Sequence, residues 1–114
     1  MFDTHWNFET IQSVCSPRHG DCGSFARALQ KIHGGELVGF YTSENDELPK
    51  HVVLKYNNTY VDFDSVATES QIAQEYFITG ENMVVLPESE KEIHDVMINQ
   101  RIVKQLVQIL KNNT

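Results

Sequence analysis

Apolar side chains recur at helical spacing in two main stretches of this chain. The first begins after Asp21 and ends at Gly34-Gly35, where conformational freedom suits a helix C-terminus. The second runs from Ser89 to about Lys111 and predicts one long C-terminal helix. The apolar positions are Phe25, Ala28, Leu29 and Ile32 in the first helix, and Ile93, Met97, Val103, Leu106, Val107 and Leu110 in the second.

Shorter runs rich in β-branched and aromatic residues lie between these helices and predict strands. Asn57-Asn58 separates two of the runs, and because asparagine tolerates positive φ, a two-residue hairpin turn is expected there. A short helix is expected at 68–77, capped by Thr68 or Ser70, and residues 4–14 predict a short helix or an irregular lead-in. The expected strands cover residues 36–42, 51–56, 59–64 and part of 80–86.

Length and charge narrow the class of protein. The 114 residues are enough for one hydrophobic core, so a single domain over 1–114 is expected. A net charge of −7 argues against a nucleic-acid backbone or an anionic membrane as partner, because both require basic patches. The N-terminus lacks the features of a signal peptide, and no apolar stretch approaches the ~18 residues of a membrane span. These observations predict a cytoplasmic protein with reduced thiols.

Cys22 stands at the predicted start of the first helix, within His19-Gly20-Asp21-Cys22-Gly23. Asp21 is a favoured N-cap type, expected to spend much of its charge on backbone N–H groups. The dipole at a helix N-terminus favours thiolate, the form of cysteine that attacks a carbonyl carbon. Cys22 is therefore a candidate nucleophile, with burial as a small apolar residue as the simpler alternative.

The predicted hairpin brings a histidine close to carboxylates. If Tyr56 pairs with Thr59, His51 lies opposite Asp64 and diagonal to Asp62, with all three on one face of the sheet. A carboxylate beside an imidazole fixes its tautomer and stabilises imidazolium, as a catalytic triad requires. The register alone favours Asp64 as the partner of His51.

Cys15, His19 and Cys22 are residue types that bind zinc, and they lie close together in the sequence. Their spacing does not match the common structural zinc sites, and no fourth ligand lies nearby in the sequence. No metal or other cofactor is therefore expected.

The motif Gly20-Asp21-Cys22-Gly23-x-Phe25-Ala26-x-Ala28-Leu29, then His51-Val52-Val53 and Tyr60-Val61-Asp62, resembles small bacterial and phage members of the papain-like and transglutaminase-like cysteine enzymes. The resemblance implies an α+β fold with a papain-like core, in which the cysteine helix packs on a small antiparallel sheet. Carried over by position, it makes Cys22 the nucleophile, His51 the general base and acid, and Asp62 the residue that orients His51. The glutamine that papain-like proteases place before the cysteine is missing, so the oxyanion donor is unassigned.

The same resemblance implies acyl chemistry on an amide. We expect a small cysteine-dependent hydrolase or acyl transferase, of peptidase, amidase or deamidase type, acting on a protein or small amide substrate. With no second lobe to build a long cleft, a small or terminal amide is favoured over an internal peptide bond. The alternative is a papain-like scaffold without turnover that binds and inhibits another protein, as a phage or mobile-element factor would.

Overall fold

The protein is an α+β domain with an antiparallel sheet at its centre. The computed structural model describes residues 6–17, 20–43, 46–63, 66–76 and 78–112. Within them, the helices are α1 (Phe8–Gln12), α2 (Cys22–His33), α3 (Glu69–Glu75), α4 (Lys91–Met97) and α5 (Gln100–Asn112). The strands are β1 (Glu36–Phe40), β2 (His51–Tyr56), β3 (Thr59–Val61), β4 (Val66–Ala67) and β5 (Met83–Val85), and a 3-10 turn, η1 (Gly80–Asn82), precedes β5.

The five strands follow the spatial order β4-β3-β2-β1-β5, and every neighbouring pair is antiparallel. The hairpin between β2 and β3 has the predicted register, with Tyr56 opposite Thr59 and Lys55 opposite Tyr60. Asn57 has the positive φ, 56°, that the two-residue turn requires. The short β3 ends at Val61, so Asp62 lies just beyond the ladder.

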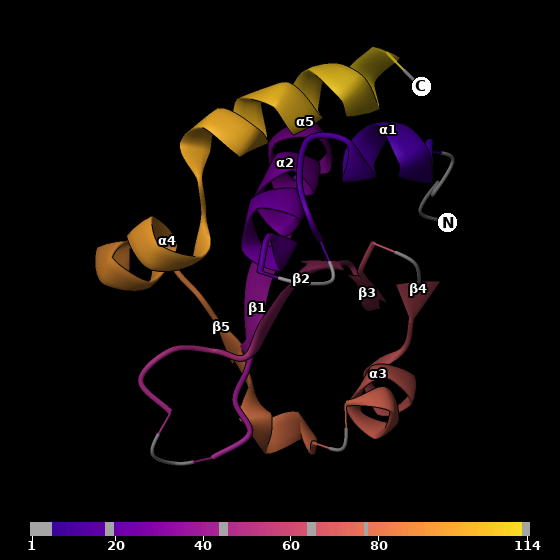
Figure 1. Cartoon of the computed structure of the whole chain (residues 1–114). Helices are drawn as coiled ribbons and strands as arrows, with labels where there is room; N and C mark the ends of the chain where they lie inside the picture. The colour runs from indigo at the N-terminus through magenta and orange to yellow at the C-terminus, as the bar shows by residue number, and fades with distance from the viewer. Residues whose placement is uncertain (1–5, 18–19, 44–45, 64–65, 77, 113–114) are drawn as a thin grey trace.

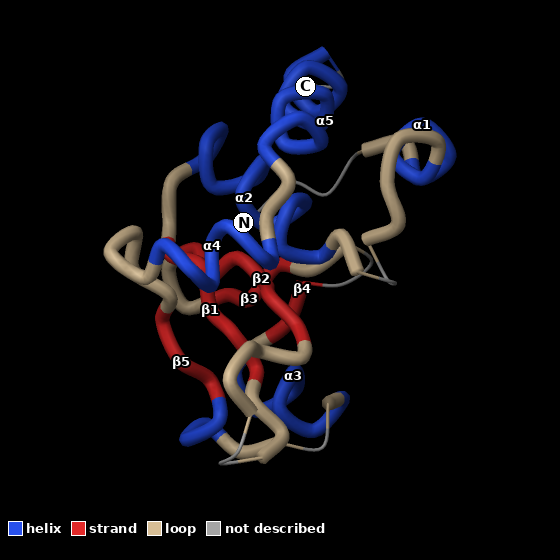
Figure 2. Tube along the Cα trace, turned by 60° about the vertical axis from the view of Figure 1, so that its left-hand side comes forward, coloured by secondary structure: helices blue, strands red, loops and turns tan. Residues whose placement is uncertain are grey.

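Two apolar layers cover the two faces of the sheet, because side chains alternate along each strand. Val52 and Leu54 of β2 pack in a cluster with α2 and α5, whereas Val53 packs in a second cluster with Ile72 of α3. Figures 1 and 2 show this arrangement, with α2 and α5 on one side of the sheet and α3 on the other. A residue at the end of β2 can therefore meet groups from both layers.

Phe63 fixes the chain directly after Asp62. Its ring packs edge-on against Phe25 of α2, with the ring centroids 5.4 Å apart. Its carbonyl oxygen accepts a hydrogen bond of 3.0 Å from Nε1 of Trp6. Asp62 is thus held between the end of β3 and a residue anchored in the core.

The prediction of one long C-terminal helix is wrong, because the chain breaks between α4 and α5. Ile98 is extended (φ −128°, ψ 120°) and buried, and Asn99 caps α5 by accepting hydrogen bonds from the N–H groups of Arg101 and Ile102. The N–H of Asn99 donates to Oγ of Ser24, 2.8 Å away in the first turn of α2. Burial of Ile98 and this contact with α2 replace the helical hydrogen bonds that a continuous helix would make.

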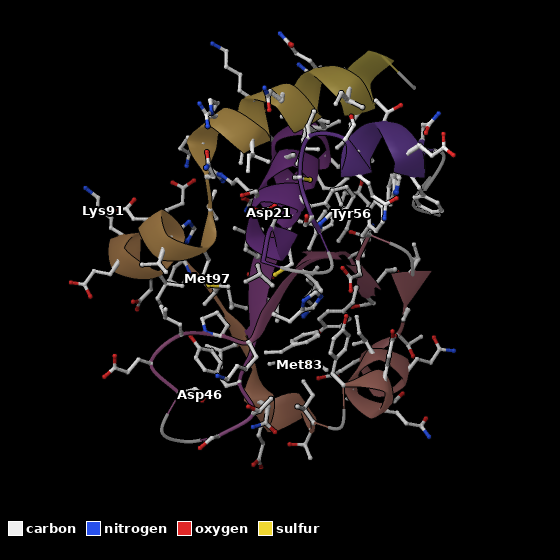
Figure 3. The ribbon with its side chains drawn as sticks, in the orientation of Figure 1. Asp21, Asp46, Tyr56, Met83, Lys91 and Met97 are labelled. Carbon is white, nitrogen blue, oxygen red and sulfur yellow. The ribbon has the colours of Figure 1, made fainter. Side chains whose placement is uncertain are left out.

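Gly23 allows the end of α4 to approach α2. A Cβ at position 23 would collide with the carbonyl oxygen of Met97 and lie 3.3 Å from its Cβ. Lys91, at the start of α4, points away from the protein, whereas Met97 lies toward α2 (Figure 3). The helix that begins at Cys22 is therefore held in place from the α4 side.

Gly23→Ala is expected to destabilise the protein by about 1–3 kcal/mol, the usual range for overpacking, because the obstacle is backbone and cannot change rotamer. At a solvent-exposed helix position the same change would stabilise the protein by up to about 1 kcal/mol. The sign of the change in unfolding free energy therefore shows whether Met97 packs against position 23. Urea unfolding measures it, with Lys31→Ala on the exposed side of α2 as the control. A Gly23→Ala protein as stable as the wild type would contradict the close contact.

Candidate active site

Cys22 is the first residue of α2, and its side chain is almost fully buried, with 6% of the residue exposed. The helix forms behind it because apolar residues face the sheet and α5, and it ends where Gly34 takes a positive φ of 82°. The sulfur thus lies at the end of the helix where the dipole favours negative charge. Both Cys22 and Cys15 are free thiols.

Asp21 occupies the N-cap position of α2, as predicted, but its side chain does not cap the helix. Oδ2 of Asp21 instead accepts a hydrogen bond of 2.7 Å from the N–H of Ser16, and the N–H of Asp21 donates to the Ser16 carbonyl at 3.0 Å. The carboxylate therefore closes the loop that leads to Cys22 and leaves the first N–H groups of the helix to other partners. The prediction that the Asp21 carboxylate would accept hydrogen bonds from the first N–H groups of the helix is wrong.

His51 opens β2, opposite Phe40 of β1. Its side chain is 14% exposed, and its ring stacks on Tyr76 with centroids 4.7 Å apart and planes 22° apart. The ring of Phe40 lies against it from another side at 5.8 Å. The imidazole is held by aromatic rings from β1 and from the end of α3.

Asp62 accepts hydrogen bonds at both carboxylate oxygens. Oδ2 lies 2.8 Å from Nε2 of His51, and Oδ1 accepts a bond of 2.7 Å from the N–H of Phe63. The residue is buried, with 6% exposed, so the carboxylate depends on these donors in place of water. The structure thus brings Asp62, as the resemblance implied, against His51, while Asp64 lies outside the described residues.

Burial alone would lower the pKa of His51, but the hydrogen bonds to Asp62 and Cys22 and the negative charge of these groups raise that pKa to about 10. Burial would raise the pKa of Asp62, yet the hydrogen bond and charge of His51 and the donors Tyr76 and Phe63 lower it. At neutral pH the two residues are therefore an imidazolium and a carboxylate.

The Cys22 thiol lies close enough to the His51 ring to form a hydrogen bond with it. Because Nε2 of His51 is engaged by Asp62, the ring nitrogen left for the sulfur is Nδ1. The chain therefore brings sulfur, imidazole and carboxylate together from α2, β2 and the residue after β3. This order of contacts is the one that nucleophilic cysteine chemistry uses.

Tyr76 is a site residue that the sequence analysis did not single out. It follows α3 directly, and its hydroxyl oxygen lies 2.6 Å from Oδ2 of Asp62 and 3.0 Å from Nε2 of His51. The sequence contains one signal for it, since Tyr76 is four residues after Ile72 and so shares the buried face of α3. A tyrosine on such a face brings a polar tip into an apolar layer, where it needs a partner.

Cys15 is also buried, and its hydrogen-bond partner among the described residues is a backbone carbonyl. Its sulfur lies 3.6 Å from the carbonyl oxygen of Ile11, and burial together with the charge of Asp21 raises the pKa of Cys15 to about 11. The residue is 7% exposed, nearly the same as Cys22. Cys15 is therefore a matched internal reference for the reactivity of Cys22.

Within the described ranges, no group of three or more His, Cys, Asp or Glu side chains is arranged to hold a metal ion. His19, which with Cys15 and Cys22 makes up the possible zinc-ligand set in the sequence, lies outside those ranges. Among the helices described, none has the length and apolar character needed to span a membrane.

Comparisons of the chain with protein-family profiles, curated proteins and solved structures found no match. The interpretation of the site therefore rests on the residues themselves and on their geometry.

Proposed function

We propose that the chain is a small cysteine-dependent acyl enzyme with a papain-like core, acting as a hydrolase or acyl transferase on a protein or small amide substrate. The observation that carries the proposal is the 2.8 Å contact between His51 and a buried Asp62, on a ring that also contacts the Cys22 thiol. A cysteine that is buried only as a small apolar residue has no need of His51 and Asp62 beside it. The reduced thiols expected of a cytoplasmic protein would keep the nucleophile available.

In the proposed reaction, the Cys22 thiolate attacks the carbonyl carbon of the amide and forms a tetrahedral intermediate. The C–N bond then breaks, and the imidazolium of His51 gives its proton to the departing amine, leaving a thioester on Cys22. Water, or an acceptor amine for a transferase, attacks the thioester while neutral His51 takes up its proton. The acyl group leaves, and the thiolate–imidazolium pair is restored. Throughout, Asp62 orients the ring and stabilises its charged form.

The N–H of Cys22 is the first candidate for the oxyanion donor. It belongs to the first turn of α2, where N–H groups have no carbonyl partner within the helix. The Asp21 side chain does not cap this end, so an oxyanion would meet the positive end of the helix dipole.

A second candidate function follows from the burial of the sulfur. With only 6% of Cys22 exposed, a substrate has little access to the nucleophile in this conformation. This favours a papain-like scaffold without turnover, for which we propose binding and inhibition of a partner protein.

Acylation by p-nitrophenyl acetate tests the proposal before a natural substrate is known. The ester is expected to release p-nitrophenolate in a rapid first turnover and then more slowly, as the thioester on Cys22 is hydrolysed. Intact mass should show one added acetyl group per chain, and peptide mapping should place it on Cys22. Cys15, equally buried, should stay unmodified, since its pKa of about 11 leaves it protonated at neutral pH.

The two candidate functions give different results in this experiment. An acyl enzyme forms the thioester and regenerates the free thiol, whereas an inert scaffold leaves Cys22 unmodified or acetylated without turnover. Equal labelling of Cys22 and Cys15 would contradict the enzyme proposal, because burial and the charge of Asp21 raise the pKa of Cys15 to about 11 and keep that thiol protonated.

A further inference from the structure

Tyr76 connects the two layers of the protein at the candidate site. Cys22 belongs to the layer of α2 and α5, whereas Tyr76 follows α3, which packs on the opposite face of the sheet. His51 lies between them at the start of β2. The groups that face His51 with charge or a titratable proton are Cys22 from α2, Asp62 after β3 and Tyr76 after α3.

The hydroxyl of Tyr76 donates to Asp62. A carboxylate only accepts hydrogen bonds, so both the tyrosine O–H and the Nε2–H of His51 are directed at Oδ2, at 2.6 Å and 2.8 Å. Hydrogen bonds to an ionised acceptor are among the stronger ones in proteins. The hydroxyl thus helps to hold the Asp62 carboxylate where it binds the imidazole.

The ring of Tyr76 restricts the imidazole itself. It stacks on His51 at 4.7 Å, and Phe40 packs edge-on against Tyr76 at 5.2 Å, which supports the stack from the sheet. A cationic imidazole over an aromatic face is also attracted to it. Rotation of the imidazole about the Cβ–Cγ bond of His51 would break both this stack and the hydrogen bond to Asp62.

We propose that Tyr76 is a positioning residue of the site, whose hydroxyl orients Asp62 and whose ring holds His51 with Nδ1 toward Cys22. The inference rests on the proposed acyl-enzyme function and goes beyond the three residues predicted for it. Tyr76 contacts no reacting atom and acts through Asp62 and His51.

Tyr76→Phe separates the hydroxyl from the ring. The variant keeps the stack on His51 and loses the donor that helps to lower the pKa of Asp62. Alkylation of Cys22 by iodoacetamide at neutral pH should slow by about fivefold to tenfold, because the ion pair of His51 and Asp62 loses one of its hydrogen bonds. Tyr76→Leu, which also removes the stack, should show a larger loss.

NMR of 15N-labelled protein gives a readout that needs no activity. In the wild type the Nε2–H proton of His51 should be a distinct, slowly exchanging signal, because Asp62 and Tyr76 enclose it. In Tyr76→Phe that signal should broaden through faster exchange. Tyr60→Phe is the matched control, since Tyr60 is buried in the same layer and is expected to leave both measurements unchanged.

The outcomes separate the two proposals. If wild-type Cys22 is acylated and Tyr76→Phe matches Tyr60→Phe in both measurements, the positioning role is overturned and the enzyme proposal stands. If wild-type Cys22 is never acylated but the His51 signal still depends on the Tyr76 hydroxyl, the enzyme proposal fails and the positioning of His51 by Tyr76 is supported.

Discussion

Replacement of Asp62 by alanine is expected to destabilise the protein by about 3–5 kcal/mol near pH 6, the range for breaking a buried ion pair. The change leaves the His51 imidazolium, the Tyr76 hydroxyl and the Phe63 N–H without their common acceptor in a buried site. Urea unfolding measures the loss. Asp95→Ala, which removes an exposed carboxylate from α4, should change stability by less than about 0.5 kcal/mol.

The loss in Asp62→Ala should depend on pH in a defined way. The pKa of His51 rises from 6.5 to about 10 on folding, so its contribution is complete below pH 6.5 and is lost as the pH rises through about 10. The pKa of Asp62 falls below its ordinary 3.8, so its contribution is present above that pH and is lost as the pH falls through the folded value. The difference between wild type and variant should therefore be largest from about pH 4 to 6.5 and shrink toward pH 10. A difference that stays constant from pH 6.5 to 10 would contradict the ion pair.

Replacement of His51 by alanine is expected to have the largest effect on reactivity. A positioned general acid and base contributes about 10²–10⁴-fold to rate, so acetylation of Cys22 by p-nitrophenyl acetate at neutral pH should fall by about 100-fold or more. Alkylation of Cys22 by iodoacetamide at neutral pH should also slow, because the imidazolium of His51 that acts on the sulfur is gone.

His94→Ala is the matched control for this measurement. His94 lies on α4 and is partly buried, with Nε2 3.3 Å from the carbonyl oxygen of Leu86. Its loss should change the rates at Cys22 far less than the loss of His51. If His51→Ala and His94→Ala gave the same rates, His51 would not contribute to the reactivity of Cys22. Binding of a partner protein without turnover would then become the favoured function.

The hairpin that carries His51 could be predicted from local sequence. The run His51–Tyr56 combines strand-forming residues with an Asn57-Asn58 turn, and both the strand bounds and the register follow from these local preferences. The start of α2 at Cys22 could also be predicted, because small residues precede a helical apolar stripe. The pairing of His51 with Asp62 could not be predicted from the register, which favoured Asp64. β3 ends at Val61, and Asp62 then turns toward the imidazole.

The features that the sequence did not predict depend on contacts between distant segments. The apolar residues of the C-terminal segment keep helical spacing throughout, yet the helix breaks before α5. The break occurs because Ile98 is buried in the core and the N–H of Asn99 donates to Ser24. Tyr76 reaches Asp62 only because α3 packs beneath the sheet. Local propensity carries no information on either event, since both are set by tertiary packing.

The split of the C-terminal segment has a consequence for the motions of the protein. α4 has no buried residue of its own, whereas α2 and α5 contribute much of the larger apolar cluster. Native proteins open first where few apolar contacts must be lost, so α4 can unwind as a local unit while the sheet and the other helices stay folded. Such an opening would lift Met97 from Gly23, directly beside Cys22. The resting burial of the thiol is thus compatible with transient access through an opening of α4.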